Sequence, residues 1–321
     1  MDKKKQLSAG AAALLVMLWS VSMLIMQLVS QLAAPFLSES WMKYVWTGVV
    51  ELTFILIPLC IVNRANQVRG LPGIHWVRGE GKAVALAAGI ALVAYPVMLI
   101  FQNVWILFLE GMGAVPEQTI MPDIHGLSGL VLAIVSVAAC AAFAEEIAMR
   151  GVLMPSLRRR MGDKAALLIT ATVFCIMHGS FSALPYTFIF GALLCWLALR
   201  TRSLWPSMMF HFVNNTIATV LSYMSQGEAV QQAAAQMTAE IRWMSILSLG
   251  FAAVPASALL AVMLYFYRRV TPGALMPEKE ADQSLWWLPL AAGAAAFATM
   301  VLNSAMNEFG GGAACVLMWF A

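Results

Sequence analysis

The segment from Ala141 to Arg150 reads Ala-Ala-Phe-Ala-Glu-Glu-Ile-Ala-Met-Arg, with two adjacent carboxylates and a guanidinium in an otherwise apolar stretch. Apolar residues continue on both sides of it, which predicts a helix inside a membrane. A charged side chain at the centre of a bilayer costs about 2.5–3.5 kcal/mol even on a lenient insertion scale, and adjacent like charges repel. The protein must compensate for such a pair, so the segment indicates a functional site inside a membrane.

The composition of the whole chain agrees with this interpretation. Of 321 residues, 61% are hydrophobic and 11% are charged, and the mean hydropathy is +0.80. Soluble domains contain about 45–50% apolar and about 25% charged residues. The apolar runs are long and do not alternate with a period of two, which favours spanning helices over a β-barrel. We therefore predict an all-α, polytopic transmembrane helix bundle with about eight or nine spans.

The first apolar run is longer than the region of about 7–15 residues in a cleaved signal peptide, so it is expected to remain as a span. The chain contains nine candidate spans, namely Leu7–Val29, Tyr44–Val62, Ala83–Leu109, Leu127–Leu157, Ala165–Ser180, Leu184–Leu199, Leu204–Tyr223, Trp243–Tyr267 and Leu285–Ser304. We divide them into N-terminal transmembrane helices (1–126), catalytic core helices (127–224) and C-terminal transmembrane helices (225–321).

The charged loop residues predict the topology, because loops rich in lysine and arginine stay in the cytoplasm. The basic residues gather at the N-terminus and after every second span, namely Lys3, Lys4, Lys5, Arg64, Arg69, Arg78, Lys82, Arg158, Arg159, Arg160, Lys164, Arg200, Arg202, Arg268 and Arg269. The alternate loops carry mainly acidic residues, namely Glu39, Glu110, Glu117, Asp123, Glu228 and Glu240. We therefore expect a multi-pass protein of a prokaryotic cytoplasmic membrane, with its N-terminus in the cytoplasm and its C-terminus outside.

Polar residues on three different spans fall at a similar depth. Glu145 lies thirteen residues from the nearest basic cluster, His178 fourteen and Asn215 thirteen, which corresponds to roughly 20 Å of helix in each case. His211 stands one turn closer to the basic side. We expect these four side chains to surround one polar cavity.

Helical spacing separates the two adjacent carboxylates. Glu146 and Arg150 are four residues apart on one helix face, where opposite charges pair. Glu145 projects about 100° away and remains available to another helix. A purely structural ion pair therefore explains Glu146 but not Glu145.

Two further pairs share the same spacing of four residues. His211 and Asn215 point toward one space, and Phe174 can pack beside the imidazole of His178. The turn after His178 contains small and polar residues, and irregular backbone at membrane depth occurs where protein or water satisfies it. This turn is expected to admit the water that hydrolysis needs.

These residues carry a family resemblance. The chain contains, in order, the motifs EExxxR at Glu145, Glu146 and Arg150, FxxxH at Phe174 and His178, and HxxxN at His211 and Asn215. This pattern, between Val131 and Tyr223, resembles the CPBP family, which groups CAAX prenyl endopeptidases with prokaryotic bacteriocin-processing and self-immunity proteins. The resemblance implies an intramembrane endopeptidase acting on a membrane-associated protein or peptide.

The resemblance also implies roles for the motif residues. Glu145 with His178 would activate a water molecule for attack on a peptide carbonyl, and His211 with Asn215 would stabilise the tetrahedral oxyanion. Glu146, Arg150 and Phe174 would organise the site. We also count Glu146 among the catalytic candidates. Hydrolysis needs a base near water and donors aimed at the oxyanion, so these assignments are chemically reasonable.

The sequence does not determine whether the site binds a metal ion. If Zn²⁺ is present, Glu145, His178 and His211 are its candidate ligands, with water in the fourth position. However, the chain lacks an HExxH motif, in which one helix supplies two histidines and the base. We therefore favour a metal-free mechanism that depends on glutamate.

Two other functional classes remain open. The same fold could serve as a non-catalytic membrane scaffold or regulator of partner proteins, or as a small-solute transporter. Transporters usually contain an internal repeat or paired broken helices, and we find neither in the sequence. The expected partners are the lipid bilayer and a peptide or protein substrate, and not nucleic acid, because the net charge of +3 comes from loop residues. Glu51 lies in the second span and could be a second functional carboxylate, but nothing in the sequence pairs it with another group.

Overall fold

The computed structural model describes residues 7–68, 80–116, 122–201, 203–227, 239–271, 273 and 285–310. Every regular element in these ranges is helical. The elements are α1 (Ala9–Ala33), η1 (Ala34–Phe36), α2 (Ser40–Ala65), α3 (Glu80–Gly111), α4 (Gly126–Ala133), η2 (Ile134–Ala139), α5 (Cys140–Glu146), η3 (Ile147–Leu153), α6 (Met154–Met177), α7 (Leu184–Arg200), α8 (Trp205–Ser225), α10 (Ala239–Val270) and α11 (Leu288–Glu308). Several residues of the topology prediction lie outside the described ranges, namely Lys3, Lys4, Lys5, Arg69, Arg78, Glu117, Arg202 and Glu228.

The helices confirm a polytopic membrane bundle. In the part of the chain that the structure describes, six helical runs are long and apolar enough to cross a membrane, namely Ala9–Phe36, Ser40–Ala65, Glu80–Gly111, Gly126–Met177, Ile246–Val270 and Leu288–Glu308. Helix α7, with 17 residues, is shorter, as predicted for the sixth span. All nine predicted spans fall on helical residues, although their ends differ by a few residues.

A kink separates the fourth and fifth predicted spans. The residues from Arg158 to Lys164 lie between the two spans, as expected, but they are helical on both sides of Gly162. Gly162 adopts φ +79°, a conformation that favours glycine because it has no side chain. The basic residues therefore lie at the ends of two helices that meet at Gly162.

Polar contacts show which helix ends lie together. At the basic end, the Ser156 hydroxyl donates to the Leu7 carbonyl over 3.2 Å, and Arg200 Nη2 donates to the Arg268 carbonyl over 2.8 Å. The following contacts form at the opposite end. The Tyr44 hydroxyl donates to the Pro122 carbonyl over 2.5 Å, and the Val115 amide donates to the Glu308 carbonyl over 2.7 Å. The described basic clusters therefore share one end of the bundle, as predicted.

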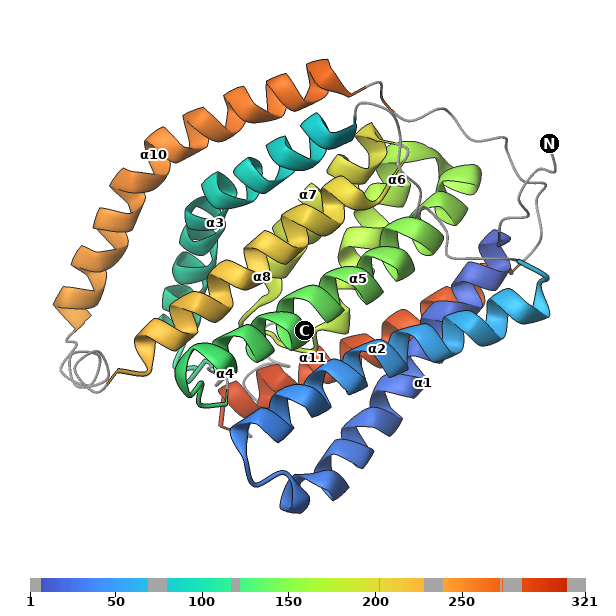
Figure 1. Cartoon of the computed structure of the whole chain (residues 1–321), viewed down its shortest axis with the longest axis horizontal. Helices are drawn as coiled ribbons and strands as arrows, with labels where there is room; N and C mark the ends of the chain where they lie inside the picture. The colour runs from blue at the N-terminus through green and yellow to red at the C-terminus, as the bar shows by residue number, and fades with distance from the viewer. Residues whose placement is uncertain are drawn as a thin grey trace.

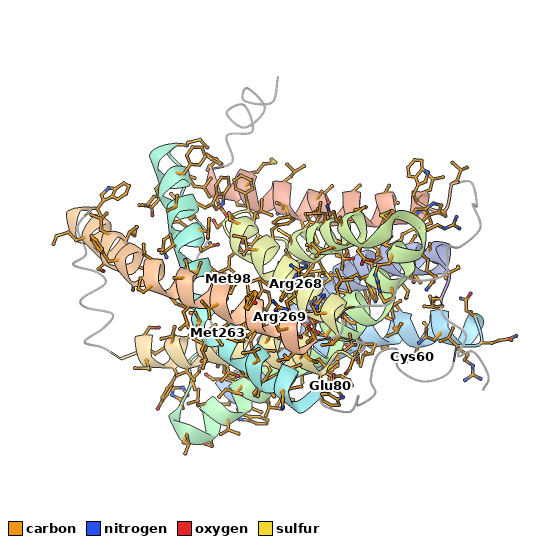
Figure 2. The ribbon with its side chains drawn as sticks, turned by 90° about the horizontal axis from the view of Figure 1, so that it is seen from above. Cys60, Glu80, Met98, Met263, Arg268 and Arg269 are labelled. Atoms are coloured by element: carbon orange, nitrogen blue, oxygen red, sulfur yellow. The ribbon has the colours of Figure 1, made fainter. Side chains whose placement is uncertain are left out.

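The helices form three groups across the bundle (Figure 1). Helices α1, α2 and α11 form one flank, α3 and α10 form the other, and the helices from α4 to α8 lie between them. Met98 of α3 and Met263 of α10 lie at the contact between those two helices (Figure 2). On the opposite flank, the buried Trp19 of α1 donates from its indole nitrogen to the Ile55 carbonyl over 3.0 Å. The central group is thus enclosed on both sides.

Two π-helical turns interrupt the central helix that carries the adjacent carboxylates. Turn η2 precedes α5 and turn η3 follows it, so the pair at 145 and 146 lies between them. A π-turn contains an extra residue per hydrogen-bonded ring and is frequent at functional sites. These turns change the direction in which later side chains project.

Candidate active site

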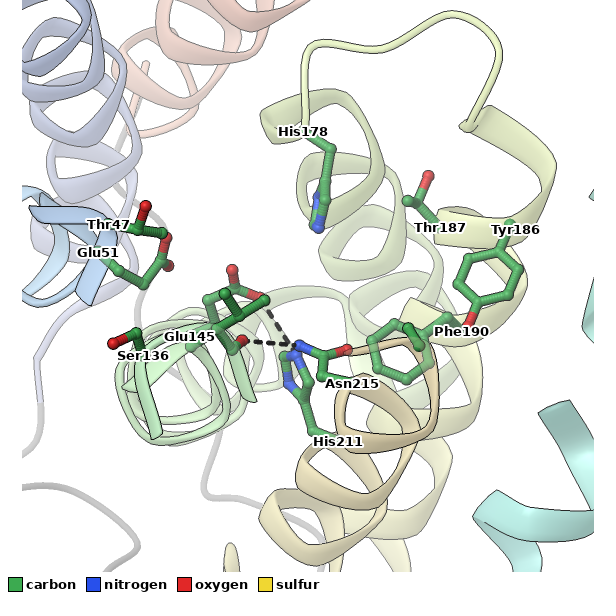
Figure 3. A pocket seen from close by; sticks show the side chains of 13 residues that line it. Thr47, Glu51, Ser136, Glu145, His178, Tyr186, Thr187, Phe190, His211 and Asn215 are labelled. Carbon is green, nitrogen blue, oxygen red and sulfur yellow. Dashed lines mark hydrogen bonds and ion pairs between the residues drawn. The ribbon is translucent and has the colours of Figure 1, made fainter. Parts of the chain in front are cut away.

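A polar cavity of about 320 Å³ lies between α2, the α4–α5 run, the α6–α7 hairpin and α8 (Figure 3). The structure brings all four residues of the predicted cluster to its wall, namely Glu145, His178, His211 and Asn215. Glu145 and His211 are buried at 7% and 2% exposure, whereas His178 is exposed. The cavity is therefore closed at its glutamate end and accessible beside His178.

Glu146 and Arg150 form a buried ion pair behind this wall. The distance between Arg150 Nη1 and Glu146 Oε1 is 2.8 Å, and neither side chain exposes any surface, which confirms the predicted pairing. Arg150 Nη2 also donates to the Gly191 carbonyl over 3.0 Å, and its Cζ atom lies 4.5 Å from the Phe174 ring centroid. Glu146 was counted among the catalytic candidates, but it is not among the residues that line the cavity. Its contacts are those of a positioning residue.

The imidazole of His211 lies between the two carboxylates. Its Nδ1 is 3.2 Å from Glu146 Oε1, and its Nε2 is 3.7 Å from Glu145 Oε2. Because Glu146 is paired with a guanidinium, it accepts hydrogen bonds and does not donate them. The proton in the shorter contact therefore resides on Nδ1, and Nε2 faces the cavity. Phe190 packs edge-on against this ring, with centroids 5.0 Å apart.

His178 is oriented by the backbone of its own helix. Its Nδ1 lies 2.8 Å from the Phe174 carbonyl, which can only accept, so Nδ1 carries the proton. In the neutral ring Nε2 then presents a lone pair, and the ring points into the cavity (Figure 3). The Phe174 ring packs beside it with centroids 4.7 Å apart, as predicted.

Helix α3 holds the turn that follows His178. Two side chains donate to carbonyl groups of the turn, Gln102 Nε2 to Ser182 over 2.5 Å and Trp105 Nε1 to Phe181 over 3.1 Å. These bonds satisfy two backbone carbonyl groups of the irregular turn.

Helix α11 holds the same turn from the other side. The Phe181 amide donates to Ser304 Oγ over 3.1 Å, and the Ser182 amide donates to Glu308 Oε1 over 3.3 Å. The Ser304 hydroxyl in turn donates to Glu308 Oε1 over 3.1 Å. Glu308 is buried at 2% exposure, so α11 supplies an internal acceptor to the turn beside the cavity.

Asn215 belongs to a polar chain on α8 that the sequence indicated only in part. Its Nδ2 donates weakly to the Val137 carbonyl over 3.4 Å, and its Oδ1 accepts from Asn214 over 3.3 Å. Asn214 also accepts from the Tyr186 hydroxyl over 2.9 Å. Asn214 and Tyr186 were missed because the HxxxN spacing names a single asparagine. The second N–H of Asn215 remains available to the cavity.

Glu51, a possible functional carboxylate for which the sequence offered no partner, also lines the cavity. It projects from α2 into the cavity near Glu145, together with the hydroxyl-bearing residues Thr47 and Ser136 (Figure 3). The pattern within the second span contained no partner for it, because the partner lies on another helix.

The three candidate metal ligands do not form a coordinating group. Within the ranges that the structure describes, no set of three or more histidine, cysteine, aspartate or glutamate residues is placed to hold a metal ion. The Nε2 of His211 and the Oε2 of Glu145 are 3.7 Å apart, and His178 stands across the cavity. The metal-free mechanism stays a prediction, and no step below requires a metal.

The comparison with family models agrees with the three motifs. Residues 127–217 match the family described as Type II CAAX prenyl endopeptidase Rce1-like. The match contains all seven motif residues and lies within the predicted core segment 127–224. No curated protein and no solved structure matches the chain. The similarity therefore supports a protease-family core within a helical membrane protein.

Proposed function

We propose that the chain is an intramembrane endopeptidase that hydrolyses a peptide bond of a membrane-associated protein or peptide. The observation that carries this proposal is the meeting of Glu145, His178, His211 and Asn215 at one cavity. Their motifs lie in the segment similar to type II CAAX prenyl endopeptidases.

Glu145 and His178 activate the water in this mechanism. The Oε2 atom of Glu145 is buried and has no hydrogen-bond partner, and Nε2 of His178 is the free acceptor of its ring. One water between them can donate to both, which aligns its lone pair with a substrate carbonyl. The carboxylate then takes a proton as the oxygen attacks, and the reaction gains typically 10²–10⁴-fold from such a base.

His211 and Asn215 stabilise the oxyanion. The amide of Asn215 offers a free N–H, and His211 donates from Nε2 while Nδ1 donates to Glu146. The pair Glu146–Arg150 keeps this ring in place, so its Nε2 lies where negative charge develops.

We also infer that the basic end of the bundle faces the cytoplasm. Arg64, Arg200 and Arg268 belong to the basic clusters that begin or end helices there. Lysine and arginine near helix ends stay on the cytoplasmic side. Cysteine accessibility labelling from each side of intact cells tests this orientation.

The first experiment compares membranes from cells that express the wild-type chain or Glu145→Gln. Gln is nearly isosteric but cannot take the proton, so peptide termini created by the wild-type chain are expected to disappear in the variant. Mass spectrometry of new termini measures this. Identical termini in both membranes, with equal protein levels, would support a non-catalytic scaffold instead.

The roles of Glu145, Asn215 and the two histidines are tested on purified protein in lipid nanodiscs. The probe is an internally quenched peptide with an S-farnesyl cysteine three residues before its C-terminus. Asn215→Ala is expected to lower turnover by about 10²–10³-fold, as the loss of one oxyanion donor does. Full activity in Glu145→Gln contradicts the base assignment. Stoichiometric zinc that is lost in His178→Ala or His211→Ala would replace the metal-free mechanism with a metal-dependent one.

A further inference from the structure

Glu51 brings a second carboxyl group into the cavity from a helix outside the matched segment. The matched segment begins at residue 127, whereas Glu51 lies on α2. Its Oε1 atom is buried without a hydrogen-bond partner. Within the described ranges, no lysine or arginine forms an ion pair with it. An uncompensated carboxyl group at membrane depth is costly and usually functional.

The approach of α2 to the central helix positions this group. Gly48 faces Ser136 so closely that an added Cβ would lie 3.4 Å from the Ser136 Cα atom. Glu51 follows three residues later on the same face of α2, and therefore reaches across to the cavity wall of α5. Thr47 and Ser136 line the same wall.

Glu51 of α2 and Glu145 of α5 line the same cavity (Figure 3). Two ionised carboxylates that share a buried site repel each other, and such pairs in enzymes share one proton. The cavity therefore holds one carboxylate that can take a proton and one carboxylic acid that can give one.

We propose that Glu51 is a second catalytic residue, which gives its proton to the leaving nitrogen after Glu145 has taken a proton from water. This proposal rests on the endopeptidase function proposed above and adds a general acid to it. Within the motifs the alternative donor is Glu145 itself, once it has taken the proton from water, and in that case Glu51→Gln keeps the wild-type amide rate.

Glu145 and Glu51 together account for every proton that the reaction transfers. The water oxygen bonds to the carbonyl carbon, the C=O electron pair moves onto oxygen, and the released proton goes to Glu145. When the intermediate collapses, the C=O bond reforms, the C–N bond breaks, and the nitrogen takes the proton of Glu51. Glu145 then passes its proton to the Glu51 carboxylate, which restores the starting state.

If Glu51 has only a structural role, its substitution is expected to give a different result. The side chain of Glu51 would then only hold α2 against α5, and its loss would lower stability with no dependence on the substrate. The other titratable groups that face Glu51 are Cys140, His178 and His211. None of them is an arginine or lysine that would keep Glu51 permanently ionised.

The experiment uses two versions of the S-farnesyl peptide, with an amide or a thioester at the scissile position, and the full chain in nanodiscs. A thiol has a pKa of about 8.5 and leaves as thiolate, so it needs no general acid. Glu51→Gln is expected to slow amide cleavage by about 10²–10⁴-fold and thioester cleavage by less than about 10-fold. Glu145→Gln is expected to lose both activities. Glu39→Gln, the same change at the exposed start of α2, serves as the control.

The outcomes separate the two proposals. Equal losses on amide and thioester, with a lower melting temperature, assign Glu51 a structural role and overturn the acid assignment. An amide rate in Glu51→Gln equal to the wild-type rate also overturns it. Both results leave the endopeptidase function intact. A wild-type chain that cleaves neither peptide, and creates no new termini in membranes, overturns the endopeptidase function and the role of Glu51 with it.

Discussion

Adjacent glutamates at 145 and 146 have opposite surroundings. Glu146 contacts a guanidinium at 2.8 Å and an imidazole at 3.2 Å, whereas Glu145 faces the cavity and lies 3.7 Å from the same imidazole, with no hydrogen bond to its buried Oε2. In an apolar environment a charge is stable only if it is paired. Glu146 therefore stabilises the site, and Glu145 is available to react.

Loss of Arg150 is expected to destabilise the fold as well as the site. Arg150→Ala leaves Glu146 buried without a cation, and breaking a buried pair in this way costs about 3–5 kcal/mol. The melting temperature and the yield of folded protein in detergent measure the effect. As a control, Asp163→Asn breaks the partly exposed pair with Arg158 at 2.8 Å, which is worth about 0–1 kcal/mol.

A double variant sharpens this test. Glu146→Gln with Arg150→Met removes both charges, and such replacements are often neutral for stability. The melting temperature should recover while turnover stays low, because His211 loses the charge that holds it. An Arg150→Ala protein that melts like the wild type would contradict the importance of the buried pair.

At the scale of elements, close helix contacts determine the shape of the site. An added Cβ at Gly191 of α7 would lie 3.0 Å from Phe174 Cδ1 and 3.5 Å from the Ala171 backbone of α6. The same residue offers its carbonyl to Arg150. Because residue 191 has no side chain, α7 can pack closely against α6, and this distance between the two helices positions His178 at the end of α6.

Gly191→Ala is expected to destabilise the protein by about 1–3 kcal/mol, as overpacking of a core does, and to lower turnover. Gly250→Ala is the matched control, since this helical glycine of α10 has no atom within 4 Å of its added Cβ. Alanine at 250 should be neutral or slightly stabilising, because it favours the helix by about 1 kcal/mol. Equal melting temperatures for the two variants would count against tight packing at 191.

The sequence predicted the elements better than their local geometry. Long apolar runs and alternating basic clusters are physical requirements of a membrane, so the spans and their alternation followed from them. The π-turns around α5 could not be predicted from the sequence. An extra residue in a helical turn rotates the polar face of a helix, and this apolar helix has no polar face in which such a rotation could be recognised. Glu51 had no partner in its own span for a similar reason, since its contact depends on how α2 packs against α5.

At the scale of the whole molecule, the site depends on helices far from its motifs. The turn after His178 accepts hydrogen bonds from α3 and donates hydrogen bonds to α11, which follows the last motif residue by more than seventy positions. A displacement of about 1 Å in an active site can cost on the order of 10²-fold in rate. On the proposed function, the flanking helices are therefore expected to affect the rate.

Glu308→Ala is expected to lower kcat on the S-farnesyl peptide by up to about 10²-fold and to leave KM almost unchanged. The variant removes the acceptor of the Ser182 amide and the Ser304 hydroxyl, so His178 loses its fixed position. Glu308→Gln keeps an oxygen acceptor and should retain most activity. Equal activity of Glu308→Ala and the wild type would show that α3 and Ser304 hold the turn without Glu308.

The late position of α11 has a consequence for biosynthesis. Ribosomes release a chain from its N-terminal side, so the motif helices enter the membrane well before α11 does. Until then the turn beside His178 lacks two of its hydrogen bonds. On the proposed function, the nascent chain is therefore expected to cleave no neighbouring membrane protein before α11 has packed against the turn.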